Sequence, residues 1–169
     1  MPKISFEDLP VHGRLWVFPA SRDLTQEEAD RCLNVVDEFL SSWSAHGVPL
    51  CAGRELIEKR FLLVGVDIDV EAPSGCSIDA LVKQLSSLGA ELGLSFIDHS
   101  SIWFREAKAV RTVSRSSFKA LVEQGVVGPS TSVFDTTLTT IGQAREDRLE
   151  RTAEETWHGR VFLGVGVLD

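Results

Sequence analysis

Residues 75–79 bring a thiol, a hydroxyl and a carboxylate together in one short turn. Cys76 and Ser77 follow Gly75, and Asp79 comes two residues later. An apolar run precedes the turn and an amphipathic segment follows it, so the turn is expected where a strand leads into a helix. The free N–H groups and the dipole at a helix start favour negative charge. The turn is therefore the strongest candidate in this chain for anion binding or for an activated thiol.

Each of these residues also has a structural interpretation. Ser77 can cap a helix, Asp79 is favourable in a first helical turn, and Cys76 can be a small buried residue. Catalysis by a thiol would need an imidazole nearby, and His46 is expected at the opposite end of the sheet. Three hypotheses stay open: a structural turn, a binding site for an anion or another ligand, and a small hydrolase or thiol-dependent enzyme with Cys76 and Asp67 as catalytic residues.

The segments on either side of the turn have clear patterns. Phe61–Val66 is an uninterrupted apolar run with the length and the β-branched content of a buried strand, and Asp67 ends it. Pro73 and its neighbours then turn the chain. After this turn, apolar residues recur with the period of a helix: Ile78, Leu81, Val82, Leu85, Leu88 and Leu92. A short strand is expected after the helix, over residues 94–97.

The residues before this strand predict a strand, a helix and another strand. Residues 14–18 predict the first strand, with an apolar run that Pro19 closes, and Thr25 with Glu28 has the spacing of a helix capping box. A long amphipathic helix follows, and a second strand is expected over residues 49–58. The order strand, helix, strand, strand, helix, strand is that of a ferredoxin-like βαββαβ domain of the α+β class, which we assign to residues 12–100.

In a ferredoxin-like sheet we expect the first and third strands to be adjacent and parallel, so that the loops after them meet at one edge. Ser21 and Arg22 would then lie beside Asp67 and the turn at residues 75–79. Two helix N-termini and a guanidinium suit a phosphate or a carboxylate, and the same field would stabilise a Cys76 thiolate. The predicted ligand-binding residues are Ser21, Arg22, Gly75, Ser77 and Asp79.

The second half of the chain predicts a smaller module. Two short strands, a short helix that Ser114 or Ser116 can cap and a further strand follow one another. The aromatic pair Trp103-Phe104, the run VSRSSFKALVEQGVV and the run GPSTSVFD together resemble a GYF-type adaptor domain. The resemblance implies a small GYF-like β/α module over residues 101–145, with an aromatic face that binds peptides.

The C-terminal residues 146–169 are assigned to a polar linker and an apolar tail. Residues 143–155 are almost entirely polar, which indicates a solvated face or a loose linker. Residues 161–168 are apolar, so we expect them to be buried. They can pack back against the two domains or pair with a second subunit in a homodimer.

Several runs spread over the whole chain resemble a family of uncharacterised bacterial proteins. They are WVFPASR, WSAHG, FLLVGVD, SGCSID, VFDTTLTT and TWH. Members of that family often carry the label ABC transporter ATPase, but this chain has no G-x-x-x-x-G-K-[ST] loop, without which a nucleotide has no phosphate cradle. The resemblance therefore supplies candidate positions and implies no mechanism.

Composition narrows the classes of function. The 169 residues carry a net charge of −8, which works against binding to nucleic acid or to an anionic membrane. The apolar runs are too short to span a bilayer, and three cysteines cannot all pair, so a reducing, cytoplasmic location is expected. No pair of Cys or His residues has metal-ligand spacing, so no metal and no cofactor is expected. We expect a cytoplasmic ligand-binding or adaptor protein whose partner is a small anion, a protein or a peptide.

Overall fold

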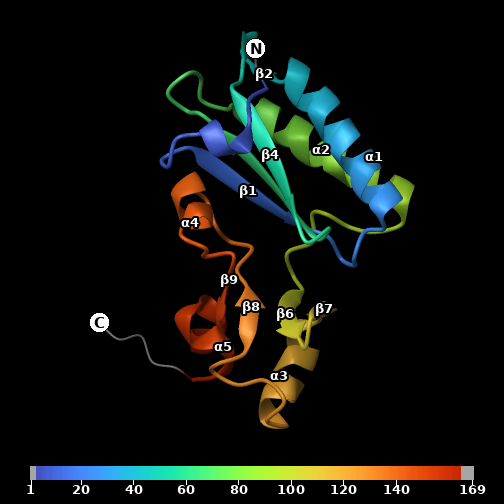
Figure 1. Ribbon diagram of the computed structural model, residues 1–169, viewed down its shortest axis with the longest axis vertical. Helices are drawn as coiled ribbons and strands as arrows, with labels where there is room; N and C mark the ends of the chain where they lie inside the picture. The colour runs from blue at the N-terminus through green and yellow to red at the C-terminus, as the bar shows by residue number, and fades with distance from the viewer. Residues whose placement is uncertain (1–2, 165–169) are drawn as a thin grey trace. The chain divides into compact units, whose positions relative to one another are not determined.

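Two units make up the described part of the chain, which is residues 3–164 of a computed structural model (Figure 1). The first unit contains the described residues up to Asp98 together with Thr137–Glu146. The second contains His99–Thr136 and the described residues from Asp147 onward. Both combine helices with antiparallel strands, so the chain belongs to the α+β class.

The sheet of the first unit is organised around β5 (Phe61–Val66), all six of whose residues are buried. β5 lies between β1 (Arg14–Pro19) and β4 (Ala52–Ile57), and it is antiparallel to both. The uninterrupted apolar run of the sequence thus becomes the strand that is covered on both faces, as its composition predicts.

Helices α1 (Gln26–Ser42) and α2 (Gly75–Leu92) cover one face of this sheet (Figure 1). The side chains between the helices and the sheet form one apolar core, which includes Phe18, Cys32, Val36, Leu40, Leu62, Val64, Leu81 and Leu85. The indole N–H of Trp43 donates to the carbonyl of Ser77 over 2.8 Å, so the end of α1 is fixed to the start of α2.

Both helices begin with a capping box. The predicted pair in α1 is confirmed: the Glu28 N–H donates to the Thr25 hydroxyl over 3.1 Å, and the Thr25 N–H donates to the Glu28 carboxylate over 3.0 Å. In α2 the N-cap is Ser74, and Ser77 is the third helical residue. The helix therefore starts at Gly75, before the first apolar residue of its periodic face.

The opposite face of the sheet is covered by two short helices, η1 (Phe6–Asp8) and α4 (Ile141–Arg145). A Cβ on Gly65 would lie 2.4 Å from the Ile141 Cδ1 and 2.7 Å from the Leu9 Cδ1, so a larger residue at this position of β5 would require both of these side chains to move. The guanidinium of Arg145 donates to the carbonyls of Glu7 and Leu9, which joins the two short helices.

Two features of the expected ferredoxin-like sheet are wrong. Residues 94–97 form no strand, so the described first unit has three strands in this sheet instead of four. β1 and β5 are antiparallel, because the connection through α1 leaves β4 parallel to β1 and the turn between β4 and β5 then reverses the chain. The order β1-β5-β4 still has the split βαβ arrangement. α1 lies between β1 and β4 along the chain, and β5 is inserted between these two strands in the sheet.

The second unit has a four-stranded antiparallel sheet in the order β7 (Ala109–Val113), β6 (Ile102–Glu106), β8 (Ser132–Phe134) and β9 (Glu150–Thr152). The predicted strand pair, the short helix and the strand at Val133 are confirmed, and the helix is α3 (Arg115–Glu123), capped by Ser114. Phe118 of α3 packs edge-on against Phe104 of β6.

The C-terminal residues differ from the expected linker and tail. Residues 143–155 contain the end of α4, β9 and the short helix η2 (Ala153–Glu155), because their few apolar residues are enough for short amphipathic elements. Helix α5 (Trp157–Phe162) follows. Val161 is 58% exposed, whereas Phe162 and Leu163 pack against the core of the second unit. Residues 165–168 of the predicted tail lie outside the described residues.

Replacing Thr25 with alanine should destabilise the protein by about 1 kcal/mol, because the hydroxyl that accepts from the Glu28 N–H is lost. Urea unfolding of the wild type and of Thr25→Ala measures the difference. Thr25→Ser keeps the hydroxyl and is the matched control, which should remain close to the wild type. An unchanged midpoint for Thr25→Ala would contradict the role of this cap.

Candidate functional site

The predicted turn at residues 75–79 forms the first turn of α2. The thiol of Cys76 is exposed, and a Cβ on Gly75 would meet no atom within 4 Å, so this part of the helix start is open to solvent. Ser77 is buried, and its hydroxyl accepts from the Ser74 N–H over 2.7 Å. Asp79 is exposed. The hydroxyl of Ser77 therefore has a structural partner, and the exposed reactive group is the thiol.

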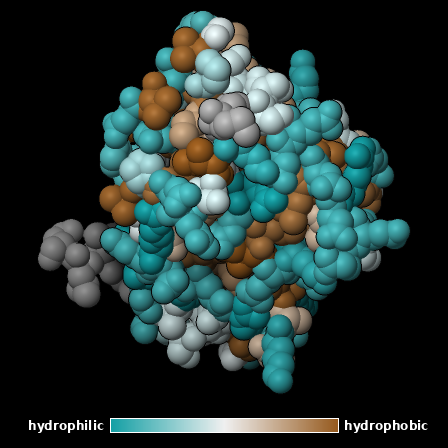
Figure 2. Space-filling view, turned by 45° about the horizontal axis from the view of Figure 1, so that its top comes forward, coloured by the Kyte–Doolittle hydropathy of each residue, from teal (hydrophilic) through white to brown (hydrophobic). Residues whose placement is uncertain are grey.

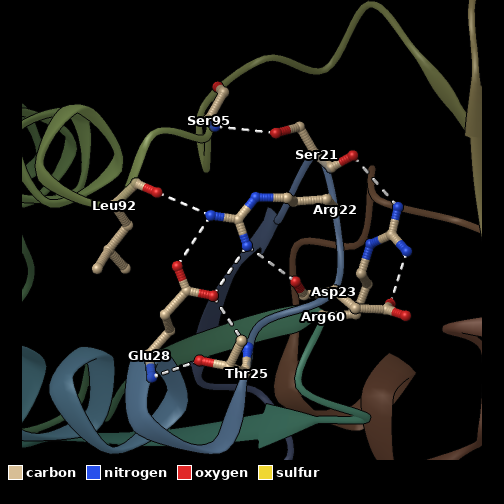
Figure 3. A network of polar contacts seen from close by, with 8 residues as sticks. All are labelled: Ser21, Arg22, Asp23, Thr25, Glu28, Arg60, Leu92 and Ser95. Atoms are coloured by element: carbon tan, nitrogen blue, oxygen red, sulfur yellow. Dashed lines mark hydrogen bonds and ion pairs between the residues drawn. The ribbon is translucent and has the colours of Figure 1, made fainter.

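Ser21 and Arg22 belong to a separate network of polar contacts (Figure 3). The guanidinium of Arg22 donates twice to the Glu28 carboxylate, each time over 2.8 Å, and once to the carbonyl of Leu92 over 2.7 Å. The Ser95 N–H donates to the Ser21 hydroxyl over 3.0 Å. The hydrogen bonds from Arg22 lower the pKa of Glu28 to about 2. Both predicted residues thus hold the start of α1 to the end of α2.

The expected meeting of Arg22 with the turn at residues 75–79 is wrong. In the antiparallel register Pro19 pairs with Phe61, whereas Arg14 pairs with Val66. The loop after β1 therefore lies where β5 begins, and the loop after β5 lies at the other end of the sheet. A second guanidinium contacts the loop after β1, because Arg60 donates to the carbonyl of Ala20 over 3.0 Å.

Asp67 lies at the end of β5, where it approaches two other possible metal ligands. The Nε2 of His12 is 2.5 Å from the Oδ2 of Asp69, and ligand atoms of His12, Asp67 and Asp69 all lie within 4.8 Å of one another. The sequence does not predict this cluster, because His12 lies more than fifty residues from the two carboxylates and only the fold brings it to them. The three residues are the best candidates for metal ligands among the described residues.

A groove of about 770 Å³ lies along β4, within the size range of small-ligand sites. It runs between the N-terminal segment, α1 and the outer edge of the strand. Its lining residues are Lys3, Ile4, Ser5, Phe6, Glu7, Leu33, Ser41, Arg54, Glu55 and Leu56. No sequence pattern predicts this groove, because its walls come from segments that are distant along the chain.

Backbone groups of β4 point into this groove. The Asp67 N–H donates to the carbonyl of Cys51 over 2.9 Å, which marks one hydrogen-bonded pair of the β4–β5 ladder. Because such pairs alternate with non-bonded pairs in antiparallel sheets, the backbone groups of Gly53 and Glu55 face β5, whereas those of Arg54 and Leu56 face outward. The outer edge of β4 therefore carries donors and acceptors that β5 does not satisfy.

The two edge strands of this sheet, β1 and β4, differ in how much of their outer edge is covered. Beside β1, the Leu15 N–H donates to the carbonyl of Thr139 over 2.8 Å, so the returning segment covers that edge. Beside β4, the Ile4 N–H donates to the carbonyl of Ala52 over 2.8 Å, which covers only the first residue of the strand. In the described residues β4 has no strand partner besides β5, so the edge at Arg54 and Leu56 stays open.

The floor of the groove carries a fixed charge network. Arg54 donates to both carboxylate oxygens of Asp37, over 2.8 and 2.9 Å, and the Lys3 amine lies 3.3 Å from the same carboxylate. Burial raises the pKa of Asp37, but the hydrogen bonds from Arg54 and Lys3 outweigh it, so the pKa lies below its usual value. The side chain of Arg54 is thus held in place before any ligand arrives.

The second unit contains a buried histidine. His158 stacks on Trp157 with ring centroids 4.0 Å apart, and its Nδ1 lies 2.8 Å from the hydroxyl of Thr156. Burial lowers the pKa of His158 to about 4. Trp103 and Phe104, the aromatic pair behind the GYF resemblance, are both buried, so neither offers an aromatic surface to a peptide.

Comparison with family models, with curated proteins and with solved structures finds no match, so the site must be interpreted from its own geometry. Within residues 3–164, no helix has the length and apolar character that a membrane span requires.

Iodoacetamide should label Cys76 and leave Cys32 unmodified, because Cys76 is exposed while burial raises the pKa of Cys32 to about 11. Arg22→Ala should leave the labelling rate of Cys76 unchanged, since Arg22 lies at the other end of the sheet. Peptide mass spectrometry resolves the two sites. Slower labelling of Cys76 in Arg22→Ala would show that the two residues are in contact.

The stability of the second unit should fall as the pH drops from 6.5 to about 4, because His158 is protonated over this range in the unfolded chain and stays neutral in the fold. Below pH 4 the total loss in the free energy of unfolding should be roughly 3 kcal/mol. Urea unfolding at a series of pH values measures the slope, and His158→Gln should flatten it. NMR titration of the ring in the folded wild type is independent of the variant, and a midpoint near 6.5 would contradict this account.

Proposed function

We propose that the protein is an adaptor that binds an extended peptide segment of a partner protein along the open edge of β4. The observation that carries the proposal is the outward orientation of the Arg54 and Leu56 backbone groups toward a groove of about 770 Å³. An exposed sheet edge pairs readily with another extended chain. Strand addition of this kind gains its affinity from main-chain hydrogen bonds and its specificity from pockets for alternate side chains.

The walls of the groove indicate how a peptide would be selected. The side chains of Arg54 and Leu56 lie on the helix side of β4, where Arg54 bonds Asp37 of α1 and Leu56 packs against the core. Leu33 and Ser41 line the groove from α1. A peptide added as a strand would therefore place every second side chain against α1, next to Leu33 and Ser41. The peptide side chains between these would point away from α1.

The alternative enzyme, with Cys76 as its nucleophile, has the exposure of that thiol in its favour. The anion site expected beside it relied on the guanidinium of Arg22, which is bound to Glu28 at the other end of the sheet. The adaptor is the better proposal, because the groove along β4 has both a defined volume and unsatisfied backbone groups.

Selection of short displayed random peptides on the immobilised full chain tests the proposal. Peptides that bind the wild type should bind Leu56→Pro about tenfold more weakly or worse, because proline removes the outward N–H while the ladder to β5 keeps its bonds. Leu56→Ala is the matched control, since it shortens the same side chain but keeps the N–H. The amide NMR signals of Arg54 and Leu56 in the wild type should shift when a selected peptide is added.

Three results would overturn the adaptor proposal. One is a selection that yields no peptide specific for this chain, and another is equal affinity for Leu56→Pro and Leu56→Ala. The third is protection of the β4 edge that rises with protein concentration in the absence of peptide, which would make a second copy of the chain the occupant. The NMR shifts keep the test valid if Leu56→Pro does not fold.

A further inference from the structure

We propose that His12, Asp67 and Asp69 form a binding site for a divalent transition-metal cation of the Zn²⁺ class. The cluster lies at the far end of β5 from Arg22 and is lined by none of the residues of the β4 groove. The inference is therefore independent of the adaptor proposal, and either can fail alone.

The three donors converge although they come from two distant segments. The ring of His12 comes from the loop before β1, and both carboxylates follow β5 directly. Their ligand atoms lie within 4.8 Å of one another. Two ligands of one cation lie at most about 4.4 Å apart when each bond is about 2.0–2.2 Å, so a small rotation of the exposed side chains brings all three donors onto one cation. An imidazole is uncommon in a merely acidic surface cluster, and it is the donor that favours a transition metal over Ca²⁺ or Mg²⁺.

Both segments are anchored, so the donors are positioned by the fold. In the loop that carries His12, the Gly13 N–H donates to the carbonyl of Pro10 over 2.9 Å, and the Gly13 carbonyl accepts from the Ile141 N–H over 3.0 Å. A Cβ on Gly13 would lie 2.8 Å from the carbonyl oxygen of Val66, so this loop packs directly against the end of β5. The backbone that carries the donors therefore needs little rearrangement, and binding orders mainly the exposed side chains of His12 and Asp69.

A thiol lies opposite Asp67, outside the three residues whose ligand atoms converge. The N–H of Asp67 donates to the carbonyl of Cys51, so the two residues are a directly opposed pair whose side chains lie on the same face of the sheet. The thiol is partly exposed. Nitrogen and carboxylate donors with a thiol close by match the ligand types of Zn²⁺. The exposure of His12 and Asp69 leaves coordination positions for water or for an anionic ligand.

Calorimetric titration of the full, chelator-treated chain with Zn²⁺ tests the proposal. The wild type should bind one equivalent, and His12→Gln and Asp69→Asn should each bind at least tenfold more weakly, because each lacks one ligand. His46→Gln is the matched control, since it removes an exposed imidazole from a hairpin turn and should bind as the wild type does. Bound Zn²⁺ should also raise the thermal midpoint of the wild type and of His46→Gln.

A stoichiometric Zn²⁺ site that persists in both His12→Gln and Asp69→Asn would overturn the assignment, as would the absence of binding to the wild type. Cys76→Ser separates these results from adventitious binding at the exposed thiol, because the predicted site should be unaffected by it. If His12 and Asp69 form only a structural pair, their variants will lower the thermal midpoint without Zn²⁺ and will leave the Zn²⁺ affinity unchanged.

Discussion

The first unit depends on the burial of β5 on both faces. Its six residues are covered by α1 and α2 on one side and by η1 and α4 on the other, and Gly65 permits that second covering (Figure 1). Because both neighbours of β5 are antiparallel to it, the loops after β1 and after β5 leave the sheet at opposite ends. This one constraint separates Arg22 from Cys76 and places Asp67 beside His12.

The same arrangement explains why the open edge is found at β4. Because β5 is the central strand, β1 and β4 are the two edges of this sheet. Each edge needs a cover or a partner. The segment before α4 covers β1, whereas the N-terminal segment pairs with Ala52 and then crosses to the other face. On the face shown in Figure 2, polar and apolar residues are interspersed.

Local signals were read correctly from the sequence. The cap at Thr25 and the buried strand at residues 61–66 follow from patterns within a few residues, and the structure confirms them. The direction of β5 relative to β1 is not a local property, because it depends on the connections through α1 and through the β4–β5 turn. The expected anion site failed for that reason, although Ser21 and Cys76 were each placed correctly at the end of a strand or the start of a helix.

Other misses have a similar cause. His12 carries no signal of its own, since its partners lie in a loop that only the fold brings near. The polar composition of residues 143–155 indicates a linker because it hides Leu149 and Ala153, two buried residues that lie next to or within β9 and η2. A groove whose walls come from the N-terminal segment, α1 and β4 has no counterpart in any single stretch of sequence.

The central claim is that the outer edge of β4 is unpaired at Arg54 and Leu56. Residue-resolved amide hydrogen exchange of the free protein tests this most directly. The account predicts slow exchange for Gly53 and Glu55, which donate to β5, and fast exchange for Arg54 and Leu56, which face the groove. Equal, strong protection of all four amides at every protein concentration would contradict it, because the edge would then already be occupied within the chain.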